Sequence, residues 1–297
     1  MNRTMALLTV ATAGVFWASG GVAVQDFFAH TTKTAMELTN IRMTTAGFIM
    51  LLIAWRLGVL KKSVAILNQN YRRWIDTAVY GIIGVVIMQF TYFKGIETGG
   101  AAPSTVIQYS CPAFVVIWQS LYNRRFPKLG ELIAVVLAMI GVLLLVTGGD
   151  FTKMLVPPEC IAWSLTSGAA FAFSAIYPKH LFALKIDPYS LTGLGMVIGG
   201  ISTFAMIDNA DWRPFLDAGV CFDVIWIILI ATVGAFLCFN AGLKYVTPEE
   251  ASVTATTEPA ASVVISFFMF GTVFGSIELI GIALVIVAIL CPTFIKR

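Results

Sequence analysis

The sequence has few charged residues and few of the residues that carry out catalytic or metal chemistry. Asp, Glu, Lys and Arg make up 12% of its 297 residues, whereas soluble domains average about 25%. Its two histidines, His30 and His180, are far apart, the five cysteines form no CxxC pair, and no HExxH or GxxxxGKS/T motif occurs. These absences argue against a soluble protein, a metalloenzyme and a pump with its own ATP site. We expect no cofactor, no metal and no enzymatic activity, with an integral membrane enzyme as a remote alternative.

The chain is instead dominated by long apolar runs. Hydrophobic residues make up 58% of the sequence and the mean hydropathy is +0.87. A membrane-spanning helix needs about 20 apolar residues, and the sequence offers ten such segments, near 5–24, 36–55, 74–93, 101–121, 129–147, 160–178, 189–207, 224–245, 250–271 and 277–295. We therefore predict an all-α integral membrane protein with ten transmembrane helices. The first run is longer than the apolar region of a signal peptide.

Lys and Arg gather in alternate loops. With the N-terminus placed in the cytoplasm, fourteen Lys and Arg residues fall on the cytoplasmic side, including the C-terminal Lys296 and Arg297, and four fall on the other side. Because positive residues favour cytoplasmic loops, both termini are predicted to face the cytoplasm. The four on the outer side are Lys33, Lys94, Lys153 and Arg213.

The two halves of the sequence resemble each other at an offset of 147 residues. Apolar matches arise easily in such a sequence, but matches of Pro, Gly, Asp and Glu do not. The informative pairs are Asp76/Asp223, Gly95/Gly242, Pro112/Pro259 and Glu131/Glu278. Each half holds five predicted spans, and because five is odd the second half must enter the membrane from the opposite side. We predict two inverted five-helix repeats, 1–149 and 150–297, with a site near the midplane between them.

Glu258 and Pro259 lie inside the ninth predicted span. A charged residue at membrane depth costs about 2.5–3.5 kcal/mol on insertion scales and marks a functional site by default. Pro259, like Pro112 in the fourth span, removes a backbone donor and is predicted to break its helix. Glu258 either binds a cationic group or exchanges a proton, or it is a neutral, hydrogen-bonded structural acid. The sequence leaves both interpretations open.

Arg42 lies within the second predicted span, roughly 9 Å from its outer end at 1.5 Å per residue. In one interpretation its long side chain reaches toward Glu258, and the two residues act in coupling or gating. In the other, which we favour, Arg42 extends to the outer interface or ties neighbouring helices together.

Aromatic and amide residues recur on several predicted spans, which is typical of a cavity for a small, partly apolar solute. Thr105, Gln108, Tyr109 and Pro112 fall on one helical face of the fourth span. The predicted cavity residues are Trp17, Ser19, Gln89, Tyr92, Gln108, Tyr109, Ser174, Tyr177, Asn240 and Glu258. Glu131 and Glu278, at the starts of their spans, are instead predicted to cap helix N-termini.

Taken together, these motifs resemble the EamA family of the drug/metabolite transporter superfamily. The resemblance covers essentially the whole chain and rests on Phe16-Trp17-Ala18-Ser19, Arg42, Ala102-Pro103-Ser104, Pro112, Leu129-Gly130-Glu131 and Gly141, and in the second half on Glu249-Glu250-Ala251-Ser252, Glu258-Pro259, Glu278 and Gly281. The chain departs from the family pattern at Gly275-Ser276-Ile277-Glu278, where a tighter Gly-Glu pair is usual. The resemblance implies a ten-helix bundle that moves small metabolites across the prokaryotic plasma (inner) membrane.

The leading functional hypothesis is a secondary transporter that exports amino acids or related small metabolites by alternating access. The alternative is uptake or exchange of organic cations such as quaternary amines, with aromatic rings binding the cation and Glu258 balancing its charge. The expected partners are a small-molecule substrate and the lipid bilayer, with protons as a candidate coupling ion and no nucleic acid. Substrate identity, direction of transport and oligomeric state do not follow from these residues.

Overall fold

The computed structural model describes residues 1–124, 126–207, 212–246, 250–251, 254 and 256–294, and most of these residues are helical. Glu249, Ser252, Lys296 and Arg297, which the sequence analysis used, lie outside them. In chain order the helices are α1 (Arg3–His30), α2 (Ala35–Arg56), α3 (Leu60–Leu67), α4 (Tyr71–Val79), η1 (Tyr80–Ile87), α5 (Met88–Gly99), α6 (Ala101–Gln108), α7 (Cys111–Asn123), α8 (Leu129–Thr147), α9 (Pro158–Ile176), α10 (Lys179–Ala183), α11 (Pro188–Phe204), η2 (Arg213–Leu216), α12 (Ala218–Ile225), η3 (Trp226–Gly234), α13 (Ala235–Leu243), α15 (Thr257–Phe270) and α16 (Ser276–Phe294).

Six helical stretches of the described chain are long and apolar enough to cross a membrane. They are Arg3–His30, Ala35–Arg56, Tyr71–Gly99, Leu129–Thr147, Pro158–Ala183 and Ala218–Leu243, and the shorter apolar helices Thr257–Phe270 and Ser276–Leu290 follow. The chain is therefore an all-helical, multi-pass membrane protein, as the sequence predicts. The fourth predicted span is a broken helix, α6 followed by α7, and the seventh corresponds to the shorter α11.

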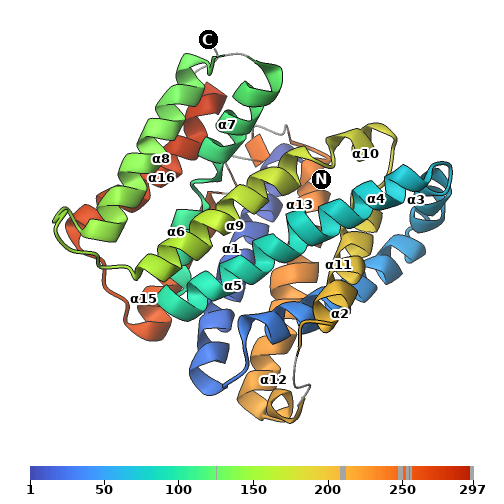
Figure 1. Cartoon of the computed structure of the whole chain (residues 1–297), viewed down its shortest axis with the longest axis horizontal. Coiled ribbons are helices and arrows are strands. Elements are labelled where there is room, and N and C mark those ends of the chain that lie inside the picture. The colour runs from blue at the N-terminus through green and yellow to red at the C-terminus, as the bar shows by residue number, and fades with distance from the viewer. Residues whose placement is uncertain (125, 208–211, 247–249, 252–253, 255, 295–297) are drawn as a thin grey trace.

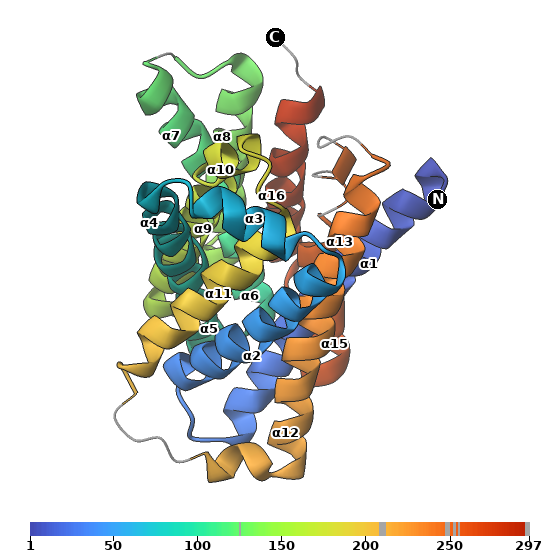
Figure 2. The same cartoon turned by 90° about the vertical axis from the view of Figure 1, so that its right-hand side faces the viewer.

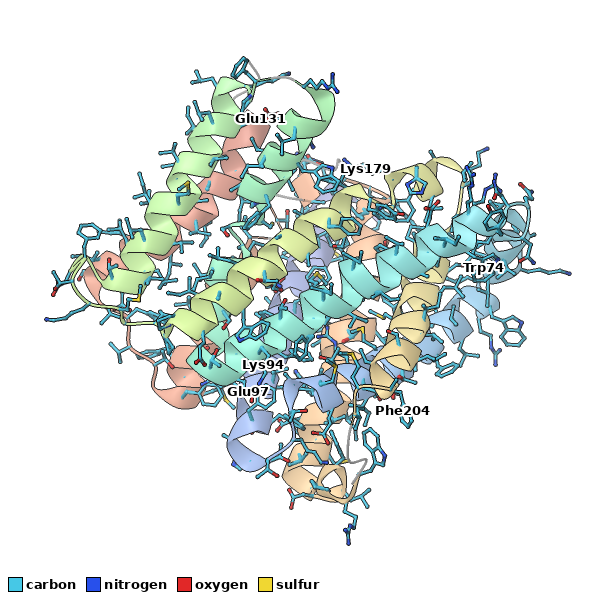
Figure 3. All side chains as sticks on the ribbon, viewed as in Figure 1. Trp74, Lys94, Glu97, Glu131, Lys179 and Phe204 are labelled. Atoms are coloured by element: carbon cyan, nitrogen blue, oxygen red, sulfur yellow. The ribbon has the colours of Figure 1, made fainter. Side chains whose placement is uncertain are left out.

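The helix connections gather at two ends of the molecule. Figure 2 shows α10, α7 and the start of α8 toward one end, and the α1–α2 connection with the start of α12 at the other. Labelled side chains follow the same division: Glu131 and Lys179 lie toward the first end, and Lys94 and Glu97 toward the second (Figure 3). Lys179 and Lys94, which the charge pattern assigns to opposite sides of a membrane, thus lie toward opposite ends of the molecule.

Five helix pairs of the described chain form the framework, each joining a helix before residue 150 to one after it. α2 packs along α11, α8 along α16, α5 along α9, and α1 along both α13 and α15 (Figure 1). The α8–α16 contact is tight because Gly141 and Gly281 face each other: a Cβ added to either would lie 2.6 Å from the other's carbonyl oxygen. Small residues let helix backbones approach closely in membranes.

Two segments depart from α-helical geometry at matching positions. η1 and η3 are π-helical, and both lie in the middle of a long helix that continues on either side. In η3 the hydroxyl of Thr232 donates to the carbonyl of Ile227, five residues earlier, at 2.7 Å. Such π-bulges often mark functional sites.

Helix ends are capped by the carboxylates that the sequence assigned to this role. Glu131 Oε2 accepts from the Lys128 N–H at 2.8 Å, and Glu278 Oε2 accepts from the Gly275 N–H at 2.6 Å. Between α5 and α6 no carboxylate cap is needed, because Gly100, with φ of 88°, turns the chain. The carboxylates therefore stabilise helix N-termini, which carry partial positive charge.

Candidate functional site

A cavity of about 800 Å³ lies among the helices and is lined from both halves of the chain. Its wall is mostly apolar, with a small number of polar side chains, a composition typical of a small-molecule site. The predicted site residues that line it are Trp17, Arg42, Gln89, Tyr92, Gln108, Tyr109, Pro112, Ser174 and Glu258. The structure thus brings together residues from α1, α2, α5, α6, α9 and α15, together with Tyr109 and Pro112 at the break between α6 and α7.

Glu258 lies at the start of α15, buried beside the break in the fourth span. Its Oε2 accepts a hydrogen bond of 2.6 Å from the Tyr109 hydroxyl. Both side chains are at least nine-tenths buried, and hydrogen bonding of a buried acid limits the free energy that its desolvation costs. The residue is therefore a hydrogen-bonded acid within the cavity wall.

Arg42 points inward from α2 and is 7% exposed. Its Nε donates to Thr232 Oγ1 at 2.8 Å and its Nη1 to Gln89 Oε1. The guanidinium carbon also lies 5.3 Å from the centre of the Phe93 ring, within cation–π range. Arg42 therefore does not extend to the outer interface. It ties α2 to η3 and α5, which is the structural part of the favoured interpretation, and it does so inside the cavity.

Gln108 and Tyr109 diverge although the sequence placed them on one helical face. Gln108 Nε2 donates to Ser167 Oγ on α9 at 2.6 Å, whereas Tyr109 reaches Glu258 on α15. The reason is the helix break: α6 ends at Gln108 and α7 begins at Cys111, so the periodicity that puts i and i+3 on one face does not extend past Gln108. Pro112 sits in the first turn of α7, where its missing N–H is tolerated.

Four predicted site residues do not line the cavity. Ser19 accepts from Trp226 Nε1 at 3.0 Å, and Asn240 donates to the carbonyl of Phe236 on its own helix at 2.8 Å. Tyr177 donates to Asp76 at 2.9 Å. Pro259 lies buried in the first turn of α15, one residue after Glu258. Ser19 and Tyr177 therefore join neighbouring helices, whereas the Asn240 amide bonds within its own helix.

Aromatic rings form one side of the cavity. Trp17 packs edge-on against Phe236, with ring centres 5.7 Å apart, and tilted against Phe239 at 5.4 Å. Tyr109 contacts Phe171 edge-on at 6.2 Å. Offset and edge-on contacts of this kind stabilise aromatic clusters beyond their buried area.

Three residues that hold predicted site side chains were not predicted from the sequence. Thr232 accepts from Arg42, and Trp226 donates to Ser19. Ser167 accepts from Gln108 and donates its own hydroxyl hydrogen bond to the Met88 carbonyl at 2.7 Å. Thr and Ser are common in membrane helices, so their type alone gives no signal. The available signal was their position: Ser167 lies on a helix that faces the interrupted fourth span, and Thr232 on a helix that faces the buried Arg42.

Comparison with known proteins places this architecture in a family. The profile of the EamA-like transporter family matches the chain twice, over residues 4–147 and 159–293. The chain is 26% identical over 291 residues to the uncharacterized inner membrane transporter YicL of Salmonella typhimurium, covering 98% of this chain and 96% of that protein. It is also 25% identical over 292 residues to the uncharacterized transporter YwfM of Bacillus subtilis, covering 98% and 94%.

The fold itself also occurs in a solved structure. That crystal structure shares 17% sequence identity with this chain and a TM-score of 0.63, covering 100% of this chain and 99% of the other. At this identity the likeness concerns the fold alone. The family profile, in contrast, matches nearly the whole chain and does so twice. The chain therefore belongs to the EamA-like transporter family, within the drug/metabolite transporter superfamily.

Proposed function

We propose that this protein is a secondary transporter that moves small organic metabolites, amino acids or related compounds among them, out of the cell across the prokaryotic plasma membrane. The observation that carries the proposal is the cavity, which is buried, about 800 Å³ in volume, and lined by helices of both halves. Its few polar groups stand among aromatic and aliphatic side chains, which suits a small solute with one polar end. The family membership supports the same conclusion.

We further propose that residues 1–149 and 150–297 are inverted repeats that together make ten membrane spans. Shifted by 147 residues, η1 (Tyr80–Ile87) falls on η3 (Trp226–Gly234) to within one residue. The same shift carries the start of α7 at Cys111 to Glu258, next to the start of α15. The packing supports a two-fold relation, because α1 with α13 corresponds to α9 with α5.

The described conformation fits an inward-facing state with both termini in the cytoplasm. The cavity wall reaches Glu131 in the first turn of α8, toward the end where Lys179 also lies. Toward the other end, Gln25 Oε1 accepts from the Ala101 N–H at 2.7 Å, and Tyr92 and Thr105 share a hydrogen bond of 2.7 Å. In alternating access these closing contacts between helices would open as the cytoplasmic end closes.

Reconstituted protein tests the proposal. A thermal-shift screen against amino acids, amines and nucleosides identifies solutes that stabilise the protein, and their flux is then measured in proteoliposomes. We expect flux of at least one stabilising solute, reduced by Glu258→Gln and unchanged by Glu97→Gln, a partly exposed residue that pairs with Lys94 at 2.9 Å. If no screened solute crosses the liposome membrane, the proposed transport activity is wrong.

Proton coupling through Glu258 is a separate part of the proposal. Glu258 is the acid that lines the deep part of the cavity, where proton exchange would be coupled to solute binding. We expect an imposed pH gradient to change the rate of solute flux in wild-type liposomes and to have no effect on Glu258→Gln. Identical rates with and without the gradient in the wild-type protein would leave facilitated diffusion as the mechanism.

Transport of organic cations is the second candidate, supported by the same residues. Trp17, Tyr92 and Tyr109 place aromatic rings in the cavity that holds the Glu258 carboxylate. Aromatic faces attract quaternary amines. This alternative predicts that Glu258→Gln abolishes binding of cations while sparing zwitterions, which a binding measurement on the purified variant distinguishes.

A further inference from the structure

Arg42 is a buried cation whose described partners are all neutral. Its hydrogen bonds go to the Thr232 hydroxyl and the Gln89 amide oxygen, and its third neighbour is the Phe93 ring. Within the described part of the chain, no carboxylate lies within 4.0 Å of its nitrogens. A guanidinium stays protonated in proteins, and buried charges are normally paired with an opposite charge. Arg42 is thus a charged side chain in the cavity wall, and the neutral Thr232 hydroxyl and Gln89 amide hold it in place.

The hydrogen-bond partners of Arg42 fix the orientation of its guanidinium group but use only some of its N–H donors. The guanidinium carries five N–H donors, and the described residues accept from two of them, one on Nε and one on Nη1. Gln89 belongs to α5 and Thr232 to η3, so the fork is braced from two sides. A guanidinium group that is held in place and has further N–H donors is suited to a carboxylate, whose two oxygens it binds through parallel hydrogen bonds.

Glu258 lines the same cavity but is engaged elsewhere. Its carboxylate accepts from Tyr109, and the described ion pairs do not join it to Arg42. Arg42 and Glu258 thus form no direct ion pair but interact electrostatically at longer range, and both border the cavity space. A solute that enters this space meets a fixed positive charge next to apolar walls.

We propose that Arg42 is the specificity-determining residue of the cavity, that it binds a carboxylate-type anionic group of the transported solute, and that it excludes organic cations lacking such a group. This inference rests on the proposed transport function, because it assigns the anion to the solute. It decides between the two candidate functions: a cation without an anionic group is repelled by Arg42 at short range in a medium of low dielectric constant. The remaining chemistry of the solute is set by the aromatic wall.

Three probes of one carbon skeleton test the assignment: 3-phenylpropanoate, 3-phenylpropanamide and 3-phenylpropylamine, which are anionic, neutral and cationic. Binding to purified full-length protein is measured by calorimetry for the wild type, Arg42→Gln, Arg42→Lys and the matched control Arg56→Gln. Arg56 lies on the same helix but is exposed and stacks on Trp55, with its guanidinium carbon 5.4 Å from the ring centre.

We expect the wild type and Arg56→Gln to bind the anion at least about tenfold more tightly than the amide or the amine. Loss of a charge-assisted hydrogen-bond pair in Arg42→Gln should weaken anion binding about 10- to 100-fold and leave amide binding unchanged. Arg42→Lys should recover part of the preference, because Lys supplies the charge without the fork. The Arg42→Lys measurement also serves if Arg42→Gln does not fold.

Three results would overturn the inference: equal binding of the amine and the anion, no binding of the anion by the wild type, or equal weakening of all three probes in Arg42→Gln. The last is what a purely structural role of Arg42 predicts. Flux in proteoliposomes separates this inference from the proposed function. Anion selectivity without flux of any solute contradicts transport alone, whereas flux of the amine at the rate of the anion contradicts the role of Arg42 alone.

Discussion

The hydrogen bond between Tyr109 and Glu258 joins the break in the fourth predicted span to the start of α15. The donor precedes the start of α7 by two residues and the acceptor is the second residue of α15. Because both groups are buried, removing one of them leaves the other without this hydrogen-bond partner. This bond is therefore expected to matter for stability as well as for the site.

Replacing Tyr109 by Phe should lower the free energy of unfolding by about 1–3 kcal/mol, the cost of leaving a buried acceptor without its donor. The measurement is the thermal unfolding midpoint of purified protein in detergent. Tyr71→Phe is the matched control, because Tyr71 is 69% exposed at the start of α4. Equal midpoints for the two variants would show that the Tyr109 hydroxyl does not stabilise the protein.

Individual site residues could be predicted from the sequence where their residue type is unusual within a membrane span. Glu258 and Arg42 stand out because ionisable groups are rare in spans, and both line the cavity. Ser19 and Asn240 are polar but bond to Trp226 and to their own helix. Residue type and helical spacing do not say which polar group faces the cavity and which one bonds to a neighbour.

At the scale of whole helices, the close packing of α8 on α16 depends on two glycines, Gly141 and Gly281. A Cβ on Gly281 would lie 2.6 Å from the Gly141 carbonyl and 2.8 Å from the Leu145 nitrogen. These are backbone atoms of a regular helix, so they cannot move aside as the tip of a side chain can. The pair would have to separate along its length.

Gly281→Val should therefore destabilise the protein by about 1–3 kcal/mol or more, the range for overpacked interiors. The readout is again the thermal midpoint in detergent, accompanied by the elution profile of the purified protein. Gly219→Ala is the control, since the nearest atom to its added Cβ is Asp217 Oδ1 at 3.5 Å. A Gly281→Val protein as stable as this control would refute the close α8–α16 contact.

The positions of the helices were predictable from the sequence, and their irregularities were predictable only in part. Long apolar runs place α1, α2, α8 and α9 because a bilayer imposes a minimum apolar length. Pro112 indicated the broken fourth span. The π-helical segments η1 and η3 carry no such signal, because neither contains a proline and both read as ordinary apolar helix.

For the whole molecule, the proposed inverted repeat predicts on which side of the membrane each helix connection lies. Connections at equivalent places in the two halves must face opposite sides of the membrane. The α1–α2 connection at Thr32 corresponds to the segment near Lys179, and the connection at Lys61 corresponds to that at Leu216. All four positions are exposed, so each is open to a labelling reagent.

Cysteine labelling at these four positions measures the arrangement directly. Thr32→Cys, Leu216→Cys, Lys61→Cys and Lys179→Cys are made one at a time in a protein whose five native cysteines have been replaced. A membrane-impermeant maleimide is then applied to intact and to permeabilised cells. We predict that the Thr32 and Leu216 variants label in intact cells and that the Lys61 and Lys179 variants label only after permeabilisation. Labelling of Thr32 and Lys179 variants from the same side would contradict the inverted repeat, and with it the alternating-access mechanism.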